Sequence, residues 1–238
     1  MKHYLAICVA AFVLAACSKV DDAGEALGAA AKRMPLPDCA TAQTVDAGAD
    51  GWKHPDCRLM LGDNSKLAIE ARYTPAEDDS TKMTLQVVAP GDATLQTIEE
   101  TMGNTFEPIS LADIDKDGRI DIRIPLETGN VNTSWALWRQ KEDNSFVRIG
   151  EPSGVSIVNT ASGYIAVQAR SSANEWDVEF YRLAMDALQS IATVTVTAQG
   201  EPDKITGVAC SVSDDGALAA LGLSGDAAKI QFCAEPVV

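Results

Sequence analysis

Alternating apolar and polar residues run along the middle of the chain and predict a series of β-strands. Residues 67–73 alternate in this way, and segments 82–88 and 93–98 flank Pro90-Gly91-Asp92, a sequence typical of a hairpin turn. Further strands are predicted at residues 119–126, 134–140, 146–149, 163–169, 177–183, 188–197 and 205–210. Their short, regular spacing predicts an all-β domain of antiparallel strands, with a propeller-like or sandwich-like arrangement.

One short helix is predicted near residues 214–221, where Asp214 would cap the first turn. Residues 40–66 carry no periodic pattern from which an element can be predicted. The sequence from residue 39 to residue 238 has the length of one ordinary domain. We therefore expect a single β-domain with a short C-terminal helix.

The first residues of the chain have the layout of a signal peptide. A basic start at Lys2 is followed by an apolar run over residues 4–16, which is shorter than the about 20 residues that span a bilayer. The run ends in Leu14-Ala15-Ala16-Cys17, which resembles the lipobox of bacterial lipoproteins. The alternative is an ordinary signal peptide with a chance cysteine.

The lipobox resemblance implies that residues 1–16 are removed and that Cys17 carries the lipid. Ser18 follows it, and in that family a residue other than Asp implies an outer-membrane address. Residues 17–38 are rich in Ala, Gly and Asp, and we expect them to be a tether. The predicted location is the periplasm, with attachment to the outer membrane through the N-terminal lipid.

Acidic residues outnumber basic ones, with 34 Asp and Glu against 19 Lys and Arg. The net charge of −15 becomes about −16 when Lys2 leaves with the signal peptide. Such a surface repels nucleic acid and anionic membranes, and it attracts basic partners or cations. Solubility alone is the alternative explanation of this charge.

The chain has six cysteines, of which Cys8 leaves with the signal peptide and Cys17 is the predicted lipid site. The other four predict two disulfides in an oxidising compartment, and three pairings are possible. Proximity in sequence favours one of these pairings, which joins Cys39 to Cys57 and Cys210 to Cys233.

One segment carries a metal-binding motif. Asp113, Asp115 and Asp117 occupy alternate positions, Gly118 follows at the sixth position, and Asp121 stands at the ninth. Calcium takes six to eight oxygen ligands at about 2.3–2.6 Å, and alternate residues of a tight loop can supply them. The carbonyl oxygen of Arg119 would add a further ligand, so we expect a structural Ca²⁺ site. Magnesium, or a solvated acidic turn without metal, are the alternatives.

The motif differs from an EF-hand, because its twelfth position is Ile124 and its flank from residue 121 alternates like a strand. It resembles instead the calcium loop of FG-GAP and VCBS-type β-proteins. True FG-GAP proteins repeat the loop several times, whereas here it occurs once.

A second resemblance covers residues 111–196. The calcium loop is followed by a strand pair that contains Trp138, then by Gly163-Tyr-Ile-Ala-Val, Glu175-Trp176 and Phe180-Tyr-Arg-Leu183. With the lipobox, this order resembles a family of single-domain periplasmic lipoproteins with a propeller-like β fold. Members of that family inhibit lysozyme-like peptidoglycan hydrolases, some as immunity proteins for type IV secretion effectors.

The resemblance implies that a loop enters the cleft of the target enzyme. Two segments are candidates for this inhibitory loop: Ser162-Gly163-Tyr164, and the stretch from Arg170 to Asn174. A plain turn at the start of a strand is the alternative for Ser162-Gly163.

No pattern favours an enzyme. The sequence lacks Gly-x-Ser-x-Gly, His-Glu-x-x-His and a glycine-rich phosphate loop, and His54 is the single histidine after residue 16. We therefore expect a non-enzymatic, calcium-binding inhibitor whose partner is a basic peptidoglycan hydrolase. The alternative is a structural or scaffolding outer-membrane lipoprotein with a calcium-stabilised β-domain and no inhibitory activity.

Overall fold

The computed structural model describes residues 35–48, 51–201, 204–213 and 217–235. Residues 36–238 belong to one compact unit. The predicted signal peptide, the lipid site at Cys17, most of the tether and the predicted cap at Asp214 lie outside the described residues.

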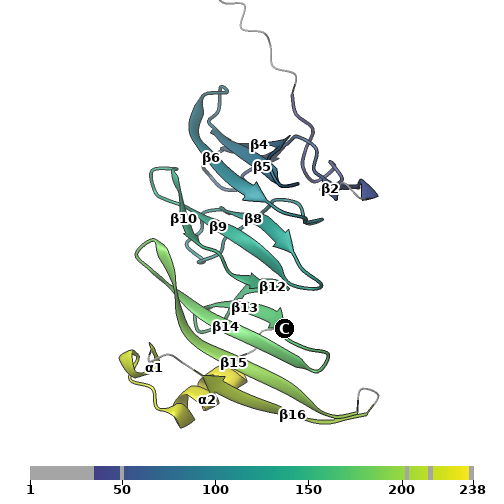
Figure 1. The fold of residues 1–238 in the computed structure, drawn as a ribbon. Coiled ribbons are helices and arrows are strands. Elements are labelled where there is room, and N and C mark those ends of the chain that lie inside the picture. The colour runs from purple at the N-terminus through teal and green to yellow at the C-terminus, as the bar shows by residue number, and fades with distance from the viewer. Residues whose placement is uncertain (1–34, 49–50, 202–203, 214–216, 236–238) are drawn as a thin grey trace, which may run out of the picture. The chain divides into compact units, whose positions relative to one another are not determined.

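Three antiparallel sheets follow one another along the chain (Figure 1), after a small strand pair, β1 (Val45–Asp46) with β2 (Trp52–Lys53). The N-terminal sheet has the order β3 (Cys57–Met60), β4 (Ala68–Pro75), β5 (Thr81–Val88), β6 (Thr94–Met102). The middle sheet has the order β10 (Phe146–Gly150), β9 (Thr133–Gln140), β8 (Asp121–Thr128), β7 (Ser110–Ala112), and β11 (Ser153–Gly154) also pairs with β9. The C-terminal sheet runs β12 (Ser156–Asn159), β13 (Ile165–Arg170), β14 (Glu175–Ala184), β15 (Ala187–Glu201), β16 (Lys204–Ser213).

The prediction of an all-β fold with antiparallel strands is confirmed. Each of the ten predicted strands overlaps an observed strand, and the predicted turn at Pro90–Asp92 joins β5 to β6. In that turn the amide of Ala89 donates to the carbonyl of Ala93 at 2.9 Å. None of the three sheets closes on itself within the described residues, and the propeller-like arrangement stays a prediction.

Buried side chains connect neighbouring sheets. One cluster joins the N-terminal and middle sheets and includes Leu85, Ile98, Ile122, Ile124 and Phe146. A second cluster joins the middle and C-terminal sheets through Trp135, Leu137, Ile149 and Ile165. A third covers the C-terminal sheet with helical residues and contains Phe180, Val194 and Phe232. Each sheet is therefore stabilised by burial against the next element along the chain.

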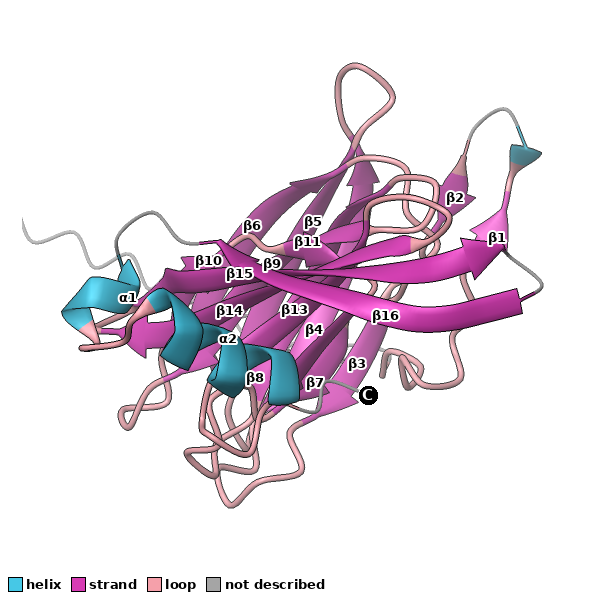
Figure 2. Ribbon diagram, turned by 90° about the horizontal axis from the view of Figure 1, so that it is seen from below, coloured by secondary structure: helices cyan, strands magenta, loops and turns pink. Residues whose placement is uncertain are grey.

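Two short helices follow the last strand: α1 (Ala217–Ala220) and α2 (Gly225–Ala234). The side chain of Ser224 caps α2 by accepting a hydrogen bond from the amide of Ala227. Helix α2 packs against β16 (Figure 2), and its Phe232 is fully buried beside Phe180. The helix predicted at residues 214–221 overlaps α1, and α2 is a second helix beyond the prediction.

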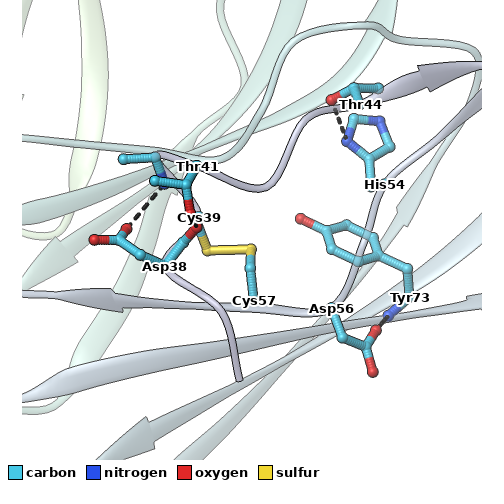
Figure 3. Close-up of a disulfide and its surroundings, with 9 residues drawn as sticks. Asp38, Cys39, Thr41, Thr44, His54, Asp56, Cys57 and Tyr73 are labelled. Atoms are coloured by element: carbon cyan, nitrogen blue, oxygen red, sulfur yellow. Dashed lines mark hydrogen bonds between the residues drawn. A yellow bond between two sulfur atoms is a disulfide. The ribbon is translucent and has the colours of Figure 1, made fainter. Parts of the chain in front are cut away.

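Both disulfides have the pairing that sequence proximity favours. Cys39 is bonded to Cys57 at the start of β3 (Figure 3), and Cys210 of β16 is bonded to Cys233 of α2. The first bond attaches the segment before β1 to the N-terminal sheet, and the second attaches α2 to the C-terminal sheet.

Gly154 stands where β11 of the middle sheet meets β13. A Cβ atom there would lie 2.3 Å from the carbonyl oxygen of Gln168, so only glycine fits this approach. The next amide, that of Val155, donates to the same oxygen at 2.6 Å. The close contact joins the two sheets through their backbones.

Among the described residues, no helix has both the length and the apolar character needed to cross a membrane.

Candidate functional site

The predicted calcium loop is the connection between β7 and β8. Ala112 pairs with Asp121 across these antiparallel strands, so the loop is closed at its base by a strand pair. Gly118 has a φ of +86°, in the left-handed region that glycine adopts without strain. The sharp turn expected at the sixth position of the motif is therefore present.

Three carboxylates converge inside this loop. One oxygen from each of Asp113, Asp115 and Asp117 lies within 4.8 Å of the other two, and all three residues are half-buried. Two oxygens on opposite sides of one calcium ion are about 5 Å apart, since each lies at about 2.3–2.6 Å from the metal. The three side chains therefore fit a single calcium ion, and their hard oxygen donors suit it chemically.

Hydrogen bonds from the loop backbone orient these carboxylates. Asp113 accepts from the amide of Asp117 through Oδ1 and from the amide of Gly118 through Oδ2, both at 3.0 Å. Asp115 Oδ1 also accepts from the amide of Asp117, at 3.2 Å. Asp117 Oδ1 accepts from the amide of Arg119 at 2.9 Å. The side chains are thus held towards the inside of the loop.

Two arginines contact the same carboxylates. Arg139, near the end of β9, donates through Nε to Asp115 Oδ2 and through Nη2 to Asp117 Oδ2, the latter at 2.8 Å. Arg119 donates through Nη2 to Asp117 Oδ2 at 2.6 Å. For Arg119, the sequence motif predicts a role of the backbone carbonyl oxygen as a ligand, and this role stays a prediction. The motif does not predict the contacts of the Arg119 side chain, and it gives no sign of Arg139.

Asp121 is not a member of this group of three. Its side chain is fully buried, and its Oδ2 and Oδ1 accept from the amides of Ile114 and Gln140, both at 2.8 Å. Burial raises the pKa of Asp121 to about 7, although the two amides oppose the increase and Asp115 and Asp117 add to it. In this arrangement Asp121 fixes the base of the loop to β9.

The loop also touches the C-terminal sheet. Lys116 Nζ donates to the carbonyl of Thr160 at 3.1 Å, and Asn159 Nδ2 donates to the carbonyl of Asp113 at 3.2 Å. Arg139 Nη1 lies 3.9 Å from Asp186 Oδ1 in the turn between β14 and β15. The candidate metal centre therefore lies where the middle and C-terminal sheets meet.

The first candidate inhibitory segment forms the turn between β12 and β13. Ser162 is exposed and donates from its amide and its hydroxyl to the carboxylate of Glu235, at 3.0 and 2.9 Å. Gly163 has a φ of +83° and lies at the tip of the turn. Tyr164 is half-buried, with its ring 5.3 Å from that of Phe232. Tyr164 is thus part of the core of the C-terminal sheet.

The second candidate segment lies at the other end of β13. The guanidinium of Arg170 donates to the carbonyls of Ser172 and Ala173 and lies over the ring of Trp176, 5.6 Å from its centroid. The Arg170 amide donates to Asn132 Oδ1, so this loop is joined to the β8–β9 turn. A shallow recess of about 400 Å³ separates the two loops.

A larger open groove of about 670 Å³ lies between the N-terminal and middle sheets, away from the three aspartates. Its charged lining consists of four glutamates and two cations: Glu99, Glu100, Glu127, Glu151, Lys82 and Arg148. Lys82 pairs with Glu99 at 2.8 Å, and Arg148 pairs with Glu100 at 2.9 Å and with Glu151 at 2.6 Å. The groove therefore keeps an excess of negative charge.

His54 is half-buried, and its ring stacks on that of Tyr73 with 5.2 Å between the centroids (Figure 3). Its Nε2 donates to the carbonyl of Thr105 at 2.9 Å, and its Nδ1 lies 3.4 Å from the hydroxyl of Thr44. Burial lowers the pKa of His54. The hydrogen bond to Thr105 raises this pKa, but its effect is smaller than that of burial. These contacts give the histidine a structural role.

Comparison with protein-family models and with curated proteins gives no match. Among solved structures, the chain is similar to a Xanthomonas type IV secretion system related protein. The TM-score is 0.39 at 12% sequence identity, and the alignment covers 73% of this chain and 95% of that chain.

Proposed function

We propose that this protein is a non-enzymatic envelope lipoprotein that binds calcium in the β7–β8 loop and inhibits a basic, lysozyme-like peptidoglycan hydrolase. The observation that carries the calcium site is the convergence of Asp113, Asp115 and Asp117 within 4.8 Å. The role of the ion is structural, because the same loop contacts both the middle and the C-terminal sheets.

The charge of the protein supports a basic partner. Acidic residues exceed basic ones by 34 to 19, and the groove between the N-terminal and middle sheets is lined by four glutamates against two cations. An acidic surface accelerates association with a positively charged protein, and salt weakens this steering because it screens the charges. The lipobox would place the protein in the compartment where cell-wall hydrolases act.

The test uses the purified protein with Cys17→Ser, so that no acyl chain is attached. It is added to a panel of lysozyme-like hydrolases, and lysis of cell walls is followed in calcium and in chelator. We expect stoichiometric inhibition that weakens when calcium is removed and when ionic strength rises. Folded, calcium-loaded protein that inhibits none of the panel would favour the scaffolding alternative.

Matched variants locate the contact surface. Glu127→Gln with Glu151→Gln removes two charges from the groove, whereas Glu77→Gln with Asp79→Asn removes two charges from the exposed β4–β5 turn. Inhibition weakened only by the first pair would assign the groove. Inhibition weakened only by Arg170→Ala would instead assign the β13–β14 loop.

A further inference from the structure

Two of the three converging carboxylates already contact a cation of the protein. Arg139 donates to Oδ2 of both Asp115 and Asp117, and the three side chains are 18%, 10% and 18% exposed, respectively. Such sheltered charges interact more strongly than exposed ion pairs, because less water screens them. The guanidinium therefore offsets part of the negative charge of the loop.

We propose that Arg139 sets the calcium affinity of the β7–β8 loop by competing with the ion for the carboxylates of Asp115 and Asp117. This inference rests on the calcium site of the proposed function. A guanidinium and a calcium ion are both attracted by these two carboxylates, and a bound ion repels a positive charge that stays beside it. Calcium binding should therefore weaken the contacts of Arg139, and Arg139 should in turn weaken calcium binding.

A second acceptor is in place for the displaced guanidinium. Nη1 of Arg139 already lies 3.9 Å from Oδ1 of Asp186, whose Oδ2 accepts from Lys141 Nζ at 3.0 Å. Asp186 belongs to the β14–β15 turn of the C-terminal sheet. If Arg139 moved towards Asp186, it would lose an ion pair within the middle sheet and gain one with the C-terminal sheet. Calcium binding would in this way be coupled to the interface between the middle and C-terminal sheets.

The test is a calorimetric calcium titration of the purified protein and of Arg139→Gln at one ionic strength. Removal of the competing charge should tighten calcium binding about tenfold, which corresponds to about 1.4 kcal/mol. The melting temperature in chelator should fall, because Asp115 and Asp117 then lose their counter-charge. Arg148→Gln is the matched control, since it removes an equally paired arginine from the groove and should leave calcium affinity unchanged.

Arg139→Lys keeps the competition testable if the glutamine variant does not fold. A lysine ammonium lacks the planar fork of the guanidinium, so it competes less well for two carboxylates at once. Its calcium affinity should lie between that of the unchanged protein and that of Arg139→Gln.

Equal or weaker calcium binding by both Arg139 variants would overturn the competition and leave the calcium site itself intact. Calcium binding by the variants but not by the unchanged protein would support it. Absence of binding in every variant would overturn the calcium site and this inference together.

Discussion

At the scale of single residues, the β7–β8 loop brings several charged side chains close together. Three carboxylates within 4.8 Å repel one another, and the repulsion is lowered by the guanidinium groups of Arg119 and Arg139. A divalent ion would lower it further and would bind the folded loop in preference to the unfolded chain. Calcium should therefore raise the stability of the protein by mass action.

Asp117→Asn should remove most of this calcium effect. At a concentration of about 100 times Kd a ligand stabilises by about 2.7 kcal/mol, which corresponds to about 5–11 °C in the melting temperature of a chain of this size. We expect the difference between scans in calcium and in chelator to fall close to zero in the variant. Asp79→Asn, in the exposed β4–β5 turn, should keep the full difference. An undiminished calcium shift in Asp117→Asn would exclude Asp117 as a ligand.

His54 should make stability depend on pH. Burial keeps its folded-state pKa below the unfolded value of about 6.5, so the unfolded chain takes up the proton first as the pH falls. The free energy of unfolding should therefore decrease below about pH 6.5, until the folded-state pKa is reached. Urea denaturation at pH 7.5, 6.5 and 5.5 measures this decrease, and His54→Gln should show a smaller one. Equal pH dependence in the two proteins would contradict the assignment to His54.

At the scale of elements, the alternation of apolar and polar residues predicts those strands that are long enough to show the pattern. Strands β4, β5 and β8 have eight residues each, and their positions follow from the apolar pattern. Strands β1, β2 and β11 have two residues each, which is too short for any period to appear. These short strands are set by tertiary contacts that sequence periodicity does not report.

Helix α2 and Arg139 were missed for different reasons. The start of α2 had a signal, because Ser224 followed by Asp226 is typical of a capped first turn. Arg139 had none, since the loop and β9 are separated in sequence and meet only through strand pairing. The aspartates of the site were predictable from their spacing in the sequence. The position of Arg139 beside them depends on the pairing register of β8 and β9, which the sequence does not show.

Gly154→Ala should destabilise the junction of β11 with β13. The added methyl group would meet the backbone carbonyl of Gln168 at 2.3 Å, and a backbone atom cannot move away cheaply. We expect a loss of about 1–3 kcal/mol, as for other overpacked buried sites. Urea denaturation measures the loss, and Gly62→Ala is the control because a methyl group there would have no atom within 4 Å. An unchanged midpoint in Gly154→Ala would mean that the two sheets separate there in solution.

Removal of the Cys210–Cys233 bond should release α2 from β16. The bond closes a separation of 23 residues, and a bond of this kind stabilises by about 3 kcal/mol in the chain-entropy model. In Cys210→Ser with Cys233→Ser, amide hydrogen exchange should rise in α2 and change little in the N-terminal sheet. The matched pair, Cys39→Ser with Cys57→Ser, should instead raise exchange around β3. Uniform acceleration in both pairs would indicate that the chain opens as one unit.

At the scale of the whole molecule, the resemblance of residues 14–17 to a lipobox predicts that the protein is held at a membrane by its N-terminus. Cys17→Ser should abolish incorporation of labelled palmitate and should move the protein from the membrane fraction to the soluble one. Cys8→Ser, within the predicted signal peptide, should change neither result. Palmitate labelling that survives in Cys17→Ser would show that the lipid is attached to another residue.

The order of the sheets along the chain also bears on how the protein acquires its fold. Each sheet is built from strands that are consecutive in sequence, and the Cys39–Cys57 bond joins residues only 18 positions apart. Local pairings close without a long search, which favours fast assembly. Among the described residues, the hydrophobic cluster between the N-terminal and middle sheets contains no residue beyond β10. The cluster that covers the C-terminal sheet includes residues of α2, near the end of the chain. A chain delivered from its N-terminus onwards can therefore complete its cores one after another, while later segments are still arriving.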